Sequence, residues 1–213
     1  MNVSLFGSTG LVGSKLLSFL ENEDQISSIR NVVRKSLNLS NPKVQEYVCN
    51  NEILPSEVFQ VETLFCCLGT TIKKAGTQEA FRAVDYQLPL LLAKQFKSLG
   101  GQHFIVISAQ GADEKSKIFY NRVKGEMERE LITLKLPKLT IVRPSLLLGD
   151  RKESRPGEAI GRFISPLLIP LMPGPLKKYR PITDLEVAKA MKEIALNRDP
   201  KTAMEFHTYL ATN

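Results

Sequence analysis

The sequence predicts an α/β protein built on a doubly wound parallel sheet, that is, a sheet with helices on both of its faces. Three observations favour this fold class. A short apolar strand at residues 2–6 leads directly into a glycine-rich turn and a helix. Strand and helix patterns then alternate as far as residue 142, which is typical of βαβ units. Two strands, at 63–68 and 103–108, are almost unbroken apolar runs, as expected where both faces of a sheet are covered.

Each element rests on its own pattern. The helix at 79–99 carries apolar residues three and four positions apart, and Pro89 should bend it. The helix at 119–134 repeats this spacing, and Thr183 with Glu186 forms a capping box at the start of the last helix. The remaining elements have shorter patterns: strands at 28–34, 44–48, 139–142 and 206–210, and a helix at 11–22.

A chain of 213 residues predicts a single domain, 1–213, that needs no disulfide or metal to fold. Its three cysteines lack the spacing of a disulfide framework or a zinc site, and two histidines exclude a histidine-cluster metal enzyme. Proline and glycine crowd the region after Gly149, so we expect a Pro-rich insertion at 150–182 within the domain, on the substrate side. Its apolar side chains, among them Phe163 and Leu167, must be buried against the domain, a ligand, a second subunit of a homo-oligomer or a membrane surface, and we expect a substrate lid.

The net charge of +7 is spread in ones and twos along the chain, and no aromatic-rich nucleic-acid motif accompanies it. We therefore expect an anionic small-molecule ligand and no nucleic-acid partner. No apolar run reaches the length of a transmembrane helix, and residues 1–7 lack the charged start and cleavage site of a signal peptide. Together with the few cysteines, these features predict a cytoplasmic protein.

The turn after the first strand has the pattern G-x-x-G-x-x-G. The first glycine permits a tight turn, the second lets a dinucleotide pyrophosphate approach the backbone, and the third lets the helix pack on the strand. The amides and the positive end of the following helix favour phosphate. On the first strand of an α/β pattern, these features predict a dinucleotide site made by Gly7, Ser8, Thr9, Gly10, Leu11, Val12 and Gly13.

The end of the second strand predicts which dinucleotide binds. NAD sites usually place a carboxylate about 20 residues past the glycine turn, whereas an arginine there accommodates the 2′-phosphate of NADP. Arg34 and Lys35 stand at this position, and no carboxylate occurs between Asp24 and Glu46. We therefore expect NADP(H); an ordinary solvated Arg–Lys pair is the alternative.

Three further residues have the chemistry of carbonyl reduction. Ser108 ends a strand whose carboxyl end should face the ligand, and Tyr120 and Lys124 share one face of the next helix. A tyrosine hydroxyl can give a proton to the carbonyl oxygen as hydride arrives at carbon. The ammonium of Lys124 would stabilise the phenolate and bond the nicotinamide ribose, and the Ser108 hydroxyl would hold the carbonyl oxygen. A chance surface pair is the alternative for Tyr120 and Lys124.

These motifs together resemble the short-chain dehydrogenase/reductase superfamily: residues 7–13, Ser108, Tyr120-x-x-x-Lys124 and the run 143–149. The runs 66–71, 84–86, 111–113 and 123–126 are similar to the atypical branch that contains the Tat-interacting oxidoreductase. The resemblance implies a Rossmann-type fold, NADP(H) as cofactor and a Ser–Tyr–Lys site. It also implies that Leu68, Gly69 and Thr70 lie against the cofactor, and that the loop beginning at Pro144 approaches the nicotinamide.

One residue departs from the superfamily pattern. Many members carry an asparagine in the central helix that assists a proton relay through the lysine, and Asp85 stands near that place here. The resemblance therefore leaves two interpretations open: a different relay, or a position that is only structural.

The leading functional hypothesis is an NADP(H)-dependent oxidoreductase of the short-chain type that acts on a small, hydrophobic carbonyl compound or alcohol. A cofactor-sensing regulator that binds NADPH with little turnover is the alternative from another class. A nucleotide-sugar epimerase would use the same tyrosine and lysine, but only 64 residues follow Gly149, which is few for a sugar-nucleotide lobe.

Overall fold

The structure is a computed structural model that describes residues 1–49, 54–148, 181–202 and 204–211. Its strands are β1 (Asn2–Phe6), β2 (Ser28–Val33), β3 (Val44–Val48), β4 (Thr63–Cys66), β5 (His103–Ile107), β6 (Lys138–Arg143), β7 (Leu147–Leu148), β8 (Ile182–Thr183) and β9 (Glu205–Leu210). Its α-helices are α1 (Leu11–Glu21), α2 (Ile72–Ala75), α3 (Gln78–Arg82), α4 (Leu88–Ser98), α5 (Phe119–Thr133) and α7 (Asp184–Ala195). A 3₁₀ turn, η1 (Ser56–Val58), and a π-helical turn, η2 (Ala83–Gln87), complete the described elements.

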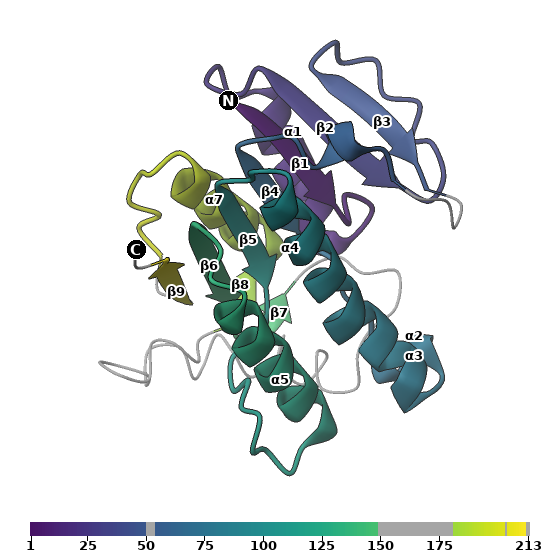
Figure 1. Cartoon of the computed structure of the whole chain (residues 1–213), viewed down its shortest axis with the longest axis vertical. Helices are drawn as coiled ribbons and strands as arrows, with labels where there is room; N and C mark the ends of the chain where they lie inside the picture. Colours follow the sequence, from purple (N-terminus) through teal and green to yellow (C-terminus); the bar gives the residue numbers. More distant parts are fainter. Residues whose placement is uncertain (50–53, 149–180, 203, 212–213) are drawn as a thin grey trace.

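Seven strands form one sheet in the order β3-β2-β1-β4-β5-β6-β9 (Figure 1). The first six run parallel, and β9 pairs antiparallel with β6. The chain leaves β1 toward β2 and β3, then returns to the other side of β1 for β4, β5 and β6. The predicted doubly wound, Rossmann-type sheet is thus confirmed, and its topological switch point lies between β1 and β4.

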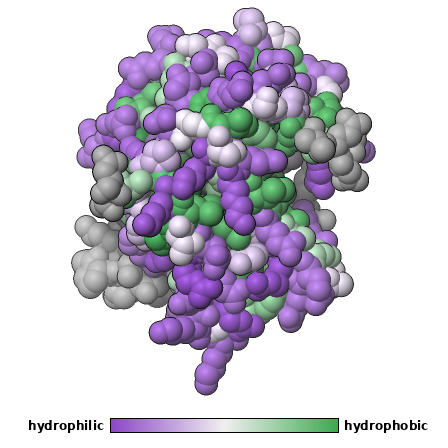
Figure 2. Space-filling view, viewed as in Figure 1, coloured by the Kyte–Doolittle hydropathy of each residue, from purple (hydrophilic) through white to green (hydrophobic). Residues whose placement is uncertain are grey.

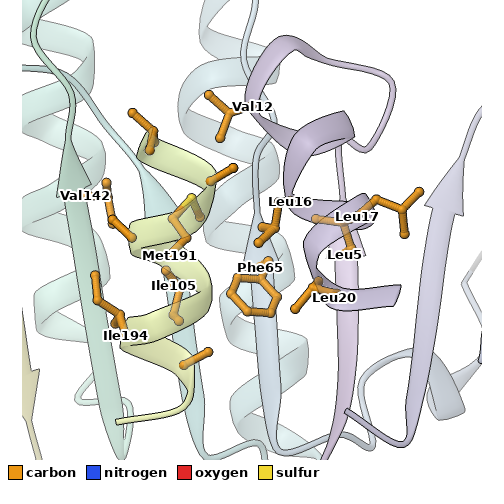
Figure 3. Packing of buried hydrophobic residues seen from close by; sticks show 14 of the residues in the cluster. Leu5, Val12, Leu16, Leu17, Leu20, Phe65, Ile105, Val142, Met191 and Ile194 are labelled. Carbon is orange, nitrogen blue, oxygen red and sulfur yellow. The ribbon is translucent and has the colours of Figure 1, made fainter. Parts of the chain in front are cut away.

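Apolar side chains cover both faces of the sheet. On one face, α1 and α7 lie side by side and bury Leu16 and Leu20 together with Met191 and Ile194 against Phe65 of β4 (Figure 3). On the other face, α4 and α5 enclose a second cluster of buried residues. The alternation of strand and helix in the sequence therefore predicts the layers correctly, because each helix needs a sheet face on which to bury its apolar stripe.

The helix expected at 79–99 is three segments. In η2 the Leu88 amide donates to the Ala83 carbonyl, a bond that spans five residues instead of four. Pro89, the second residue of α4, has no amide to continue the regular ladder. Pro89 predicts a bend in the helix, whereas the structure has a π-helical turn that ends two residues before this proline.

The C-terminal part confirms two predictions and adds one element pair. Thr183 and Glu186 form the expected capping box at the start of α7, and the strand expected at 206–210 is β9. The two-residue strands β7 and β8 pair in parallel, and they were not predicted because two residues carry no periodic pattern. The expected lid, with Phe163 and Leu167, lies in 149–180, outside the described residues.

The surface is mostly polar. Figure 2 shows hydrophilic residues over most of the displayed face, with hydrophobic side chains gathered in a band across its middle. Within the described residues, none of the helices is both long enough and apolar enough to cross a membrane.

Candidate active site

The predicted site segments meet at one edge of the sheet. Gly7 follows β1, Arg34 follows β2, Leu68 follows β4 and Ser108 follows β5, all at the carboxyl ends of parallel strands. Pro144 follows β6 at the same edge, and its carbonyl accepts the Gln110 amide at 2.9 Å. The strand order thus brings the candidate residues to the edge where open α/β sheets bind ligands.

Steric contacts explain the glycine turn. Gly7 has φ +90°, and a β-carbon there would lie 2.6 Å from the Cys67 carbonyl oxygen, so only glycine fits between β1 and β4. A β-carbon on Gly13 would clash with the Gly7 carbonyl oxygen, while Gly10 closes the turn by donating to that oxygen at 2.9 Å. The turn therefore holds α1 tightly against the end of β1.

The start of α1 fits an anionic group. Its N-cap, Gly10, has no side chain to bond the first amides, and its first turn contains no acidic residue. The Ser8 hydroxyl is buried and has no partner among the described residues. Free amides, a positive helix end and an unpartnered hydroxyl are the donors that a dinucleotide phosphate requires.

The two expected cations and one unexpected anion lie near the end of β2. Arg34 and Lys35 are exposed. The Glu46 carboxylate of β3 accepts the Ser36 hydroxyl at 2.6 Å and the Leu37 amide at 3.0 Å. The Ser36 hydrogen bond lowers the pKa of Glu46, against the opposing effect of burial and with further help from the loop amides. The loop after Lys35 is therefore built around a carboxylate.

Sequence reasoning missed Glu46 because it counted carboxylates only along the chain. The strand β3 lies beside β2 in register, with Asn31 opposite Glu46, and this pairing brings the carboxylate to the loop that follows Arg34 and Lys35. The predicted strand at 44–48, next to the predicted strand at 28–34, was the signal that could have found it.

Ser108 follows β5 directly, and Tyr120 and Lys124 lie on α5. Ser108 is buried, donates its backbone amide to the Val142 carbonyl at 2.7 Å, and has a hydroxyl without a partner among the described residues. Tyr120 is half-buried in the first turn of α5, where its ring centroid lies 5.7 Å from that of Phe81. Lys124 follows one turn later and is buried. The expected spacing thus places a phenol and an ammonium on one helix face, and the ammonium lies 3.5 Å from the carbonyl oxygen of Ile107, the residue before Ser108.

Lys124 is paired with an acid inside the protein. Its Nζ lies 2.8 Å from Asp85 Oδ1 and 3.5 Å from the Ile107 carbonyl, and Asp85 Oδ2 accepts the Thr70 amide at 2.8 Å. Burial acts to lower the pKa of Lys124, but the charge of Asp85 and the neighbouring Tyr120 outweigh it, so the pKa is raised. Lys124 is therefore held as an ammonium.

The ion pair of Asp85 with Lys124 was not predicted from the sequence. The available signal was the place of Asp85 on the apolar stripe of the helix, four residues after Phe81 and three before Leu88. A charge on a buried stripe needs a partner, because an isolated buried charge is costly.

Two other titratable residues, Cys66 and His103, are buried in the core. Burial raises the pKa of Cys66 to about 11, which leaves the thiol protonated. Burial, with a smaller effect of Lys138, lowers the pKa of His103 to about 3, and its Nε2 bonds Thr140 Oγ1 at 2.8 Å.

The chain matches one protein family and is similar to several curated proteins. Residues 27–166 match the family described as HIM1. The chain is 34% identical over 202 residues to "Protein FMP52, mitochondrial" of Debaryomyces hansenii, covering 92% of this chain and 88% of that protein. It is 37% identical over 169 residues to "Protein HTATIP2" of Rattus norvegicus, covering 76% and 69%. The second relative confirms the resemblance to the Tat-interacting branch.

Two solved structures share the fold. One, MoeE5 in complex with UDP-glucose and NAD, has a TM-score of 0.68 at 17% identity, covering 93% of this chain and 73% of that one. The other, the oxidoreductase ylbE from Lactococcus lactis, has a TM-score of 0.64 at 19% identity and covers 100% and 93%. At these identities the likeness supports the fold alone.

The expected cytoplasmic location is wrong. FMP52 relatives from several fungi, including Debaryomyces hansenii and Emericella nidulans, are named as mitochondrial proteins. The observations behind the expectation, few cysteines and no secretory signal, distinguish secreted chains from others. They do not separate the cytosol from mitochondria, where thiols also occur free.

Proposed function

Because the chain belongs to the HIM1 family, we propose that it is an NADP(H)-dependent oxidoreductase of the short-chain type, acting on a small carbonyl compound or alcohol. The observation that carries the proposal is the group of Ser108, Tyr120 and Lys124 at the sheet edge that also holds the glycine turn. The names of the FMP52 relatives further support a mitochondrial location. Cell fractionation tests that location directly.

Several residues would hold the cofactor. The amides at the start of α1 and the Ser8 hydroxyl would bind its pyrophosphate. Arg34 and Lys35 would bind the 2′-phosphate, while Lys124 would bind the nicotinamide ribose. The segments at 68–70 and Pro144 would line the nicotinamide half. When bound, the cofactor supplies or accepts the hydride.

The protein's own residues would move and hold the proton. The Tyr120 hydroxyl donates a proton to the carbonyl oxygen in reduction and removes it in oxidation. The Lys124 ammonium favours the phenolate through its charge. The unpartnered Ser108 hydroxyl donates a hydrogen bond to the same substrate oxygen, which supports the charge that develops there.

One observation favours the alternative of an NADPH-binding regulator. The Asp85 carboxylate neutralises Lys124 at 2.8 Å, and a neutralised lysine stabilises a phenolate less. Such a protein would bind cofactor and turn over slowly.

Cofactor binding and turnover separate the two functions. NADPH at ~100 times its dissociation constant should stabilise the fold by ~2.7 kcal/mol, and NADH at the same concentration much less. Steady-state NADPH oxidation over a panel of aldehydes and ketones should then show turnover. Binding with no turnover on any carbonyl would favour the regulator, and equal stabilisation by both nucleotides would contradict the NADP(H) preference.

A further inference from the structure

Asp85 uses both of its carboxylate oxygens inside the protein. Oδ1 faces the Lys124 ammonium at 2.8 Å, and Oδ2 accepts the backbone amide of Thr70 at 2.8 Å. The two side chains of the ion pair are 2% and 4% exposed. A single carboxylate therefore connects α5 to the loop after β4, and both of these elements would contact the cofactor.

The backbone around Asp85 departs from a regular helix. Asp85 lies in the middle of η2, the π-helical turn closed by the bond from the Leu88 amide to the Ala83 carbonyl. This turn packs against α5. Single π-helical turns occur frequently at functional sites, because the extra residue redirects the side chains next to it. The π-helical turn here contains Asp85, whose buried carboxylate faces Lys124.

The electrostatic surroundings of Lys124 make Asp85 its main counter-charge. The groups that interact with the ammonium are Asp85 of η2, Tyr120 of α5 and Cys66 of β4. Cys66 is protonated because burial raises its pKa to about 11, so it contributes no charge near neutral pH. Without Asp85, Tyr120 would be left to oppose the unfavourable effect of burial on the ammonium.

We infer that Asp85 is a positioning residue that keeps Lys124 protonated and in place, and that couples it to the cofactor-facing loop at Thr70. That Lys124 and the Thr70 loop both contact a cofactor rests on the proposed function. In this arrangement the lysine and the loop move together, because one carboxylate holds both. The enzyme then keeps its lysine charged up to high pH, so activity and cofactor affinity persist on the alkaline side.

The first test uses the protein without cofactor. In the wild-type protein the Nζ resonance of Lys124, assigned by its loss in Lys124→Met, should titrate above the value of about 10.4 that is usual for lysine. In Asp85→Asn, which keeps the size of the side chain but removes the charge, the titration should move down by about one to three pH units. Wild-type titration at or below the ordinary value overturns the inference, whether or not the variant folds.

The second test measures function as pH rises. The alkaline limit is the pH above which NADPH affinity or kcat/KM falls. In Asp85→Asn both alkaline limits should move to lower pH, by about the same amount as the Lys124 titration. Asp85→Glu keeps the charge and should keep the wild-type limit. Glu23→Gln is the matched control, because it also removes the carboxylate of a lysine ion pair. Glu23 lies just after the C-terminal end of α1, and its carboxylate is 2.9 Å from Lys192 Nζ of α7. This control should leave both limits unchanged.

The outcomes separate the inference from the function on which it rests. A shifted Lys124 titration in a protein that never turns over supports the positioning role and contradicts the oxidoreductase. Normal turnover, with Asp85→Asn folded and every pH limit unmoved, contradicts the positioning role and leaves the oxidoreductase standing. A purely structural role would change stability alone and move no pH limit.

Discussion

At the amino edge of the sheet the buried polar side chains of His103 and Thr140 bond each other, whereas at the carboxyl edge several buried polar side chains have no partner within the described residues. His103 bonds Thr140 at 2.8 Å, and Thr140 lies 3.0 Å from the Thr208 hydroxyl. At the other edge the hydroxyls of Ser8 and Ser108 are buried without a partner. Asn31, inside β2, also has an unpartnered buried amide, for which the structure offers no reason.

On the proposed function, this difference separates groups that stabilise the fold from groups that would bind the cofactor or the substrate. A buried hydroxyl without a partner costs about 1–3 kcal/mol, so its persistence at one edge requires a compensating role. The ion pair of Asp85 and Lys124 lies at the same edge, and its cost is balanced internally. Changes at the carboxyl edge should therefore alter function, and changes at the amino edge should alter stability. One expected exception is the ion pair, which should affect both.

The largest expected effect tests that exception. Lys124→Met leaves Asp85 buried without a counter-charge and should lower the free energy of unfolding by about 3–5 kcal/mol. Urea unfolding followed by circular dichroism measures it. The double variant Lys124→Met/Asp85→Asn should recover most of the loss, because neither charge is then left unpaired. If the second substitution does not restore the free energy of unfolding, the loss in Lys124→Met comes from packing and not from the unpaired charge.

Tyr120→Phe should separate function from stability at the carboxyl edge. The ring and its contact with Phe81 remain, so stability and NADPH affinity should stay close to wild type. Turnover should fall by ~10²-fold or more, because the proton donor is gone. Tyr209→Phe, on β9, is the matched control and should turn over normally. Equal rates in Tyr120→Phe and wild type would remove Tyr120 from the mechanism.

At the amino edge, His103 should make stability depend on pH. Its pKa is about 3 in the fold and about 6.5 in the unfolded chain, so the unfolded state takes up the proton first as pH falls. The stabilisation is full above pH 6.5 and is lost between pH 6.5 and 3. Between pH 7 and 4.5, wild type should lose about 2 kcal/mol more than His103→Gln in urea unfolding. Parallel losses in the two proteins would show that His103 has no part in acid sensitivity.

The smallest expected effect concerns the loop after β2. Glu46→Gln removes a negative charge beside the loop that follows Arg34 and Lys35, so NADPH should bind about 2–5-fold more tightly, with NADH little changed. Isothermal titration calorimetry measures both affinities. Glu62→Gln, at the amino edge, should change neither. If Glu46→Gln weakens NADPH binding instead, the main role of the carboxylate is to shape the loop.

The parts of the site that could be predicted from sequence are those determined by neighbours along the chain. The positive φ of Gly7 and the close contact of Gly13 with Gly7 are set within one turn, and Tyr120 and Lys124 share one helix. The positions of Asp85 and Glu46 depend instead on which elements lie side by side. Adjacency of strands and the register of packed helices come from the whole fold, so a local pattern could indicate a buried acid but not its partner.

The packing of α7 on α1 has a consequence for the newly made chain. The helix α1, with the buried Leu16 and Leu20, packs beside the last helix, α7, with the buried Met191 and Ile194, in one apolar cluster (Figure 3). At about 5–20 residues per second, roughly 10–30 seconds of synthesis separate the two helices. During that interval the side of α1 that packs on α7 has no native cover, and any chaperone that meets the chain on the ribosome has a binding surface near its N-terminus.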